Sequence, residues 1–220
     1  MQPTFVFDFD STVVGVETLE LLAEITLSSK DNKDQILKQI QEITNQGMEG
    51  KITFDESLSK RIKLFQATRN DIEKAAKQIK STISPSIQKN VDFFIQNSNR
   101  IIIISGSFKK LILETTRLLG IADKNVFANT FKFDKKDNII GIDELNPLSK
   151  DNGKVNQIKL LNIKTPIYAI GDGYSDYQIK KSGLATKFFA YTEHAKRDKV
   201  IKEADIVVKN FDEFLNYIKT

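Results

Sequence analysis

TFVFDFDS, the stretch at residues 4–11, joins an apolar run to a pair of carboxylates. Its first four residues are β-branched or aromatic and predict a buried strand. Asp8 and Asp10 follow at the carboxyl end of that strand, where open α/β sheets place their ligand sites. Because carboxylates are costly to bury without charged partners, the stretch predicts an anionic site ready to hold a metal. The alternative is that both aspartates only begin a turn or cap the next helix.

The composition restricts the class of protein. The 220 residues are 28% charged and 40% hydrophobic, an ordinary globular balance for one large domain or a core with an inserted smaller one. No run approaches the roughly 18 apolar residues of a membrane span, so no membrane partner is expected. The lysines behind the net charge of +4 are spread along the chain, so we expect solvated helix faces and no nucleic-acid partner. No secretory signal is visible and cysteine is absent, which favours a cytoplasmic location.

The residue counts also restrict the chemistry. Without cysteine the chain has no thiolate nucleophile and no Cys-ligated zinc. A Ser-His-Asp triad would have to use the single histidine, His194, and no nucleophile-elbow sequence is present. We expect His194 to be a surface residue. Chemistry must therefore rely on Asp, Glu, Lys, Arg and Ser side chains and on backbone amides.

Residues 17–83 read as helical and free of strands. Apolar side chains recur at helical spacing in residues 17–25 and 34–43, and again after each of two capping-box patterns at residues 53–56 and 68–71. These four helices predict a helical cap domain over residues 16–83. The cap would be inserted into a core domain formed by residues 1–15 and 84–220.

From residue 84 onward, strands and helices alternate. Ser84 followed by Pro85 predicts an N-cap with proline at the first helical position and a helix over residues 87–95. The four isoleucines at 101–104 predict a buried strand of the parallel type. We expect further strands at 126–128, 167–170, 188–190 and 206–208, helices at 108–119, 154–161 and 212–218, and a hairpin joining 131–133 to 139–142 across Asp137-Asn138. The pattern predicts an α/β fold, a Rossmann-like doubly wound parallel sheet with the helical cap inserted.

Three of the predicted strands end in polar clusters. Asp8 and Asp10 follow the first strand, Ser105-Gly106-Ser107 the isoleucine strand, and residues 171–176 (GDGYSD) the strand at 167–170. Lys154 begins the helix before that last strand. If the strands are neighbours, their ends meet at one pocket. The alternative for each cluster alone is a turn, a loop or a surface lysine.

The side chains of this pocket suit phosphoryl transfer. Asp8 and Asp172 offer the carboxylate oxygens that Mg²⁺ prefers, and a shared cation would reduce the repulsion between a carboxylate and a phosphate. Asp8 is the expected nucleophile, forming an aspartyl phosphate, and Asp10 the general acid and base. Lys154 would neutralise the remaining charge. Ser105 offers a hydroxyl, and Gly106 lets backbone amides approach a phosphoryl oxygen.

The chain resembles the haloacid dehalogenase (HAD) superfamily of phosphotransferases over nearly its whole length. The four motifs of that superfamily are matched in order by residues 8–13, residues 105–108, Lys154 and residues 171–176. The resemblance implies Mg²⁺ as cofactor, held by Asp8, by Asp172 and by the backbone carbonyl of Asp10, with Asp176 behind them. It also implies that Ser107 and Ser175 contribute to phosphate binding.

Within the superfamily, the chain is most similar to phosphoserine phosphatases. Residues 48–54 and the arginine that follows resemble the stretch where those enzymes hold the amino acid. The resemblance implies that Arg61 pairs with the substrate carboxylate and Glu17 with its ammonium group, which suits a guanidinium and a carboxylate. Met48 and Phe54 would cover the site and exclude water. The alternatives are surface charges for the first pair and cap core for the second.

The chain departs from the family pattern at three positions. Ser107 stands where the family often has glycine, Ser175 where asparagine or threonine is usual, and Tyr174 where the residue is small. Residues 188–197 match no motif. The expected activity is hydrolysis of O-phospho-L-serine by a monomer or homodimer. The alternatives are another small phosphomonoester such as phosphohomoserine, transfer to another acceptor, or a non-catalytic phosphometabolite-binding protein.

Overall fold

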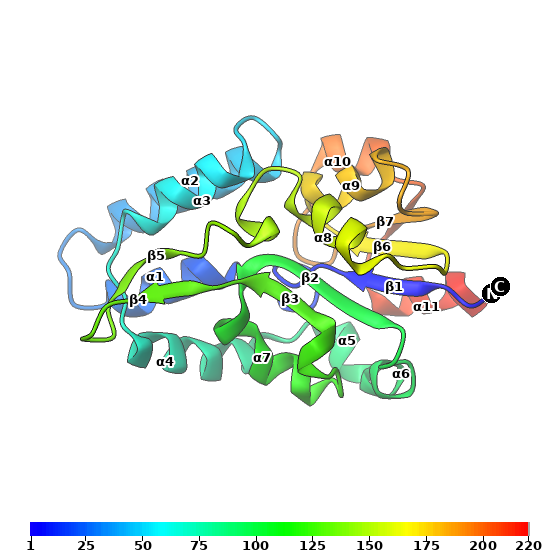
Figure 1. Ribbon diagram of the computed structural model, residues 1–220, viewed down its shortest axis with the longest axis horizontal. Helices are drawn as coiled ribbons and strands as arrows, with labels where there is room; N and C mark the ends of the chain where they lie inside the picture. The colour runs from blue at the N-terminus through cyan, green and yellow to red at the C-terminus, as the bar shows by residue number, and fades with distance from the viewer. Residues whose placement is uncertain (220) are drawn as a thin grey trace.

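Six parallel strands form the central sheet of the computed structural model, which describes residues 1–219 (Figure 1). Their order is β3 (Val126–Asn129), β2 (Ile101–Phe108), β1 (Thr4–Phe7), β6 (Ile167–Gly171), β7 (Lys187–Tyr191) and β8 (Ile206–Val208). On β1, Phe5 lies opposite Ile101 of β2 and Tyr168 of β6. This confirms the predicted α/β class, and it makes the three strands with polar ends neighbours.

Helices cover both faces of the sheet. In Figure 1, one face carries α5 (Pro85–Lys89), α6 (Val91–Gln96), α7 (Lys109–Leu118) and α11 (Phe211–Lys219), and the other α8 (Gly153–Leu161), α9 (Tyr174–Lys181) and α10 (Asp198–Glu203). Because side chains alternate along a strand, Phe5 and Phe7 of β1 join an aromatic cluster with Phe214. Val6 joins a second cluster with Val155 of α8 on the opposite face.

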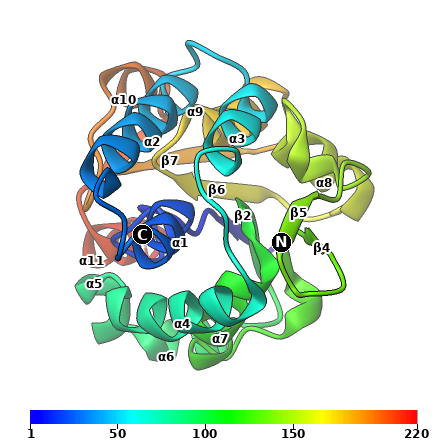
Figure 2. The same cartoon turned by 90° about the vertical axis from the view of Figure 1, so that its left-hand side faces the viewer.

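Four helices lie beyond the carboxyl ends of the strands. They are α1 (Thr18–Thr26), α2 (Lys33–Met48), α3 (Phe54–Ile62) and α4 (Arg69–Ile79), and no strand interrupts them among residues 17–80. Figure 2 shows α2 and α3 on one side of α1, with α4 on the other side, where it packs against α7. Thr68 opens α4 with a complete capping box. The four predicted helices are thus all present.

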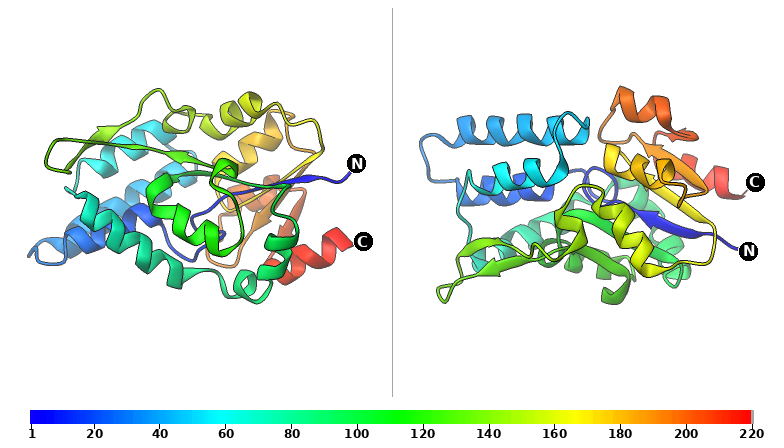
Figure 3. Two further views of the ribbon diagram at one scale, coloured as in Figure 1. Left: turned by 60° about the horizontal axis from the view of Figure 1, so that its bottom comes forward. Right: turned by 45° about the horizontal axis from the view of Figure 1, so that its top comes forward.

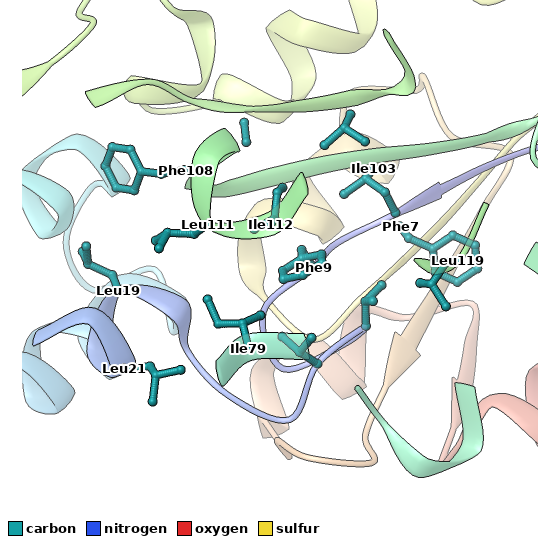
Figure 4. Close-up of a cluster of buried hydrophobic side chains, with 14 of the residues drawn as sticks. Phe7, Phe9, Leu19, Leu21, Ile79, Ile103, Phe108, Leu111, Ile112 and Leu119 are labelled. Carbon is teal, nitrogen blue, oxygen red and sulfur yellow. The ribbon is translucent and has the colours of Figure 1, made fainter. Parts of the chain in front are cut away.

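The helices next to the sheet share its apolar core. Leu19 of α1 and Ile79 of α4 belong to one cluster with Phe7 of β1 and Ile103 of β2 (Figure 4). The hairpin of β4 (Phe131–Phe133) and β5 (Ile139–Ile142) extends toward the same end of the molecule, as Figure 1 shows. The start of β1 and the end of α11 lie at the opposite end (Figure 3).

The predicted boundary between the isoleucine strand and the helix after it is wrong. The isoleucine strand does not end at residue 104, because β2 continues to Phe108 and pairs again with β3 at Asn129. The side-chain amide of Asn129 donates to the Gly106 carbonyl at 2.9 Å and holds this extension in place. Ser105 and Ser107 therefore lie on extended strand backbone, and α7 begins only at Lys109.

The helix predicted over residues 87–95 is two helices. The backbone leaves helical geometry at Asn90, whose side-chain amide donates to the Ser86 carbonyl and to Asp212 Oδ1. Ser84 does not cap α5 with its hydroxyl, which donates to the Thr12 carbonyl at 2.8 Å. The Ser84 hydroxyl thus binds a distant segment instead of capping its own helix, and the break at Asn90 coincides with a contact to the distant Asp212.

Candidate active site

The polar ends of β1, β2 and β6 meet at one edge of the sheet. After β1 the chain turns sharply, with Ser11 at a φ of 53° and the Phe9 carbonyl accepting from the Val13 amide at 2.8 Å. The turn places Asp8 and Asp10 beside Ser105 of β2 in one small cavity. The convergence expected from the strand pattern is therefore present.

Lys154 links two of the aspartates. Its Nζ lies 2.7 Å from Asp8 Oδ1 and 2.7 Å from Asp176 Oδ1, and all three side chains are at most 6% exposed. Burial alone would lower the pKa of Lys154, but Asp176 and Asp8 raise it above its ordinary value. The lysine is therefore a buried counter-ion of the two aspartates and not a surface residue.

Three buried carboxylates lie close enough to share a cation. Asp8, Asp172 and Asp176 each present an oxygen within 4.8 Å of the others. Burial is the main cause that raises the pKa of Asp172 to about 7, and Arg197, whose Nε donates to Asp172 Oδ2 at 3.0 Å, acts against it. Asp176 uses one oxygen for Lys154 and accepts the Gly173 amide with the other. This donor set, made of hard oxygen atoms in excess negative charge, fits Mg²⁺.

Asp10 is held by one oxygen only. Its Oδ2 accepts hydrogen bonds from the Thr18 amide at 3.1 Å and from the Thr18 hydroxyl at 2.9 Å. Its Oδ1 is buried and has no hydrogen-bond partner among residues 1–219. Burial first, and then Glu17 and Asp8, raise the pKa of Asp10 well above its ordinary value. These surroundings favour a protonated carboxyl group, the form that a general acid requires.

The cavity around these groups is small. It measures about 30 Å³ and is lined by Asp8, Asp10, Glu17, Met48, Phe54, Arg61, Ser105, Gly106, Ser107, Lys154 and Ser175, together with three apolar side chains. Such a volume holds only a few water molecules. Phe54 covers Gly106 so closely that a β-carbon there would lie 2.6 Å from its ring. A larger hollow of about 310 Å³ adjoins it and shares Met48, Phe54 and Arg61.

Opposite charges stand on the walls of this cavity. Arg61 is 5% exposed, and its Nη1 donates to the Thr44 hydroxyl at 3.3 Å. Glu17 Oε1 accepts the Ser11 hydroxyl at 2.7 Å, and this side chain is 12% exposed. Burial is the main cause that raises the pKa of Glu17 and lowers that of Arg61. Neither residue is a surface charge, so that alternative is wrong for both.

The comparisons with known proteins agree with this geometry. A family model described as haloacid dehalogenase-like hydrolase matches residues 5–180, which contain all four motifs. The chain belongs to this family. A phosphoserine phosphatase of Arabidopsis thaliana is 31% identical over 213 residues, covering 96% of this chain and 70% of that protein.

Two solved structures resemble the haloacid dehalogenase-like fold of this chain. A phosphoserine phosphohydrolase-like protein from Francisella tularensis subsp. tularensis has a TM-score of 0.89 and 33% identity, covering 99% of this chain and 100% of that one. A structure described as a phospho-aspartyl intermediate analogue of phosphoserine phosphatase has a TM-score of 0.77 and 25% identity, covering 99% of each chain. The expectation of an enzyme in the class of phosphoric monoester hydrolases is confirmed. Among the described residues, no helix is long and apolar enough to cross a membrane.

The sequence motifs missed three polar residues of this haloacid dehalogenase-like site. Thr18 holds Asp10, Asn129 holds the Gly106 carbonyl, and Arg197 holds Asp172. Arg197 lies in the segment that matches no motif and looks there like one more charge in a mixed run. His194 is exposed, as expected, and its Nε2 lies 2.8 Å from the Ser84 hydroxyl.

The turn between α2 and α3 is held against the sheet domain. Gly50 adopts a φ of +67°, and its Cα faces the ring of Tyr174 so closely that a β-carbon would lie 3.1 Å from it. Lys199 of α10 donates to the Glu49 carbonyl at 3.2 Å and lies 4.7 Å from the centre of the Tyr174 ring. These contacts keep the turn over the cavity, and they give Tyr174, one of the departures from the family pattern, a packing role.

Proposed function

We propose that the chain is a Mg²⁺-dependent phosphatase that hydrolyses O-phospho-L-serine to L-serine and phosphate. The observation that carries the proposal is the small cavity, which combines Asp8 and Asp10 with the buried Arg61 and the largely buried Glu17. The first pair supplies phosphoryl-transfer chemistry, and Arg61 and Glu17 match the two charges of an amino acid. Relatives named phosphoserine phosphatase support the same substrate.

The reaction proceeds in two displacements at phosphorus. Asp8 attacks the phosphoryl group and the bond to the serine oxygen breaks, while Asp10 gives its proton to that oxygen. Water then attacks the aspartyl phosphate, Asp10 takes up a proton from the water, and phosphate leaves with Asp8 restored. Lys154 and the Phe9 amide both contact Asp8 Oδ1, so we assign the attack to Oδ2. Ser105, Gly106, Ser175 and the backbone of Ser107 would surround the phosphoryl oxygens.

The buried aspartates would hold the metal. We assign Mg²⁺ to Asp8, to Asp172 and to the backbone carbonyl of Asp10. Asp176 would stay behind them, because both of its oxygens already accept hydrogen bonds from Lys154 and the Gly173 amide. When bound, Mg²⁺ supplies positive charge that reduces the repulsion between carboxylate and phosphate.

The helical part would act as a cap domain over residues 16–83, on a core of residues 1–15 and 84–220. A cavity of about 30 Å³ is too small for phosphoserine by itself, so we expect the cap to move outward to admit it. Met48 and Phe54 would then exclude water from the closed site. The two departures that favour another ester are engaged elsewhere, since Ser107 contacts Thr18 and Tyr174 contacts Gly50. The cytoplasmic location and the monomeric or dimeric state stay predictions.

Phosphate release tests the proposal directly. The purified chain with Mg²⁺ is expected to prefer phosphoserine to phosphothreonine, phosphohomoserine, and sugar and nucleotide monophosphates, and Asp8→Asn is expected to abolish release. Arg61→Ala should impair phosphoserine far more than phosphoethanolamine, which lacks the carboxylate. Arg69→Ala is the matched control, because Arg69 pairs with Asp137 on the surface. Equal losses on both esters would mean that Arg61 does not bind the amino acid.

A further inference from the structure

The hydroxyl of Ser107 contacts Thr18 across the boundary between sheet and cap. Ser107 Oγ and Thr18 Oγ1 are directly hydrogen-bonded, although 89 residues separate them. Ser107 is 5% exposed and Thr18 is fully buried. Since Thr18 also holds Asp10, one continuous line of hydrogen bonds runs from β2 through the start of α1 to the carboxyl group beyond β1.

The direction of these hydrogen bonds follows from the number of protons. A backbone amide can only donate, so Oδ2 of Asp10 is an acceptor of the Thr18 amide. When the acid proton of Asp10 is on Oδ1, the single hydroxyl proton of Thr18 also goes to Oδ2. The Thr18 oxygen must then accept from its other neighbour, which is Ser107. Ser107 thus donates to Thr18, and Thr18 donates to Asp10.

This direction reserves the second oxygen of Asp10 for the substrate. Oδ2 receives two donors, whereas Oδ1 is buried without a partner among the described residues, in a side chain that lines the cavity. An acid must present its proton within hydrogen-bond reach of the leaving oxygen. Without Ser107, the Thr18 hydroxyl could rotate and accept a proton from Oδ2 instead. The proton would then lie on the oxygen that faces Thr18.

We propose that Ser107 is a positioning residue that acts through Thr18 to keep Oδ1 of Asp10 directed at the leaving group. This inference rests on the proposed function, because it concerns the protonation of an alkoxide leaving group by Asp10. Ser107 departs from the family pattern, and this role explains its hydroxyl without any contact between that hydroxyl and the substrate.

The leaving group provides the test. The values of kcat/KM are measured for O-phospho-L-serine, whose alkoxide needs a proton, and for p-nitrophenyl phosphate, whose leaving group does not. Ser107→Ala is expected to lower kcat/KM about tenfold on phosphoserine, the change that corresponds to one lost hydrogen bond, and several-fold less on the aryl ester. Ser107→Thr keeps the hydroxyl and is expected to restore most of the loss. Ser149→Ala, which removes another buried hydroxyl outside the site, is the control for stability.

A double-mutant cycle separates positioning from simple packing. Thr18→Val should show the same preference for the aryl ester, and adding Ser107→Ala to it should cause no further loss, because both residues act through one hydrogen bond to Asp10. Equal losses on the two esters, an unchanged rate on phosphoserine, or additive losses would each overturn the role of Ser107.

The outcome also distinguishes this inference from the substrate assignment. If the wild-type chain prefers another alkyl phosphate, the substrate proposal is wrong and the same ratio is measured with that ester. If the wild-type chain hydrolyses no phosphomonoester, both proposals are wrong. Melting temperatures of the variants, compared with Ser149→Ala, show whether a lost activity only reflects a lost fold.

Discussion

Lys154→Met tests the charge balance of the buried site. The substitution keeps an unbranched side chain but removes a cation that lies 2.7 Å from both Asp8 and Asp176. Removing one partner of a buried ion pair costs about 3–5 kcal/mol, because the remaining charge has no counter-ion. Here one lysine serves two carboxylates, so we expect at least the lower value. For a chain of this length the loss corresponds to a fall in melting temperature of roughly 6–20 °C.

The loss should depend on Mg²⁺ and on pH. Mg²⁺ binding to the same carboxylates supplies positive charge, so the destabilisation should be smaller with Mg²⁺ than with EDTA. Burial raises the pKa of Asp176, so this carboxyl group can take up a proton in place of the lysine, and the loss should be smaller at pH 5.5 than at pH 8. Turnover should fall by about 10²-fold or more even with Mg²⁺, because Lys154 no longer stabilises the transferring group.

Urea unfolding in EDTA and in Mg²⁺ measures this effect. Lys80→Met is the matched control, since Lys80 lies 2.9 Å from Glu114 in an ion pair whose side chains are 36% and 38% exposed. Such a surface pair is worth about 0–1 kcal/mol. A Lys154→Met variant that loses no more stability than Lys80→Met would refute the reasoning, because the lysine would not be the counter-ion of the two aspartates.

Three further changes test other parts of the site. Gly106→Ala should lower kcat/KM by roughly 10²-fold with little change in melting temperature. The new methyl group would displace the ring of Phe54 and shift the bound substrate. Unchanged kinetics would contradict the close contact between Gly106 and Phe54. Lys199→Ala should speed hydrogen exchange in residues 47–53 by about two- to fivefold and leave residues 69–79 unchanged, since it weakens the contact with Tyr174. Burial raises the pKa of Asp172 to about 7, so the folded chain binds more protons than the unfolded chain between the ordinary value of 3.8 and about 7. The metal-free melting temperature should therefore fall as pH rises through that window. The increase in melting temperature that Mg²⁺ causes should grow over the same window, because the metal binds the deprotonated carboxylate. A Mg²⁺ effect independent of pH would contradict the assignment of Asp172 as a metal ligand.

The sequence alone predicted most of the elements and most of the candidate site, but it missed the helices α9 and α10. Apolar runs followed at once by polar residues predict buried strands with reactive ends, and this pattern is local, so it is visible without coordinates. Asp8 and Asp172 were found in this way because each directly follows its strand, and Ser105 because it follows the isoleucine run, although β2 continues beyond it. The helical spacing of residues 17–83 likewise predicted four helices.

The tertiary structure determined which side chains hold the reactive groups. Thr18, Asn129 and Arg197 carry no local signal, because their partners lie 8, 23 and 25 residues away. Contacts with distant segments also extended β2 to Phe108 and divided the helix at Asn90. Hydrophobic spacing reports only which face of a segment is buried. Hydrogen-bond partners depend on the order of the strands and on where the helices dock, and these are settled only when the whole chain packs.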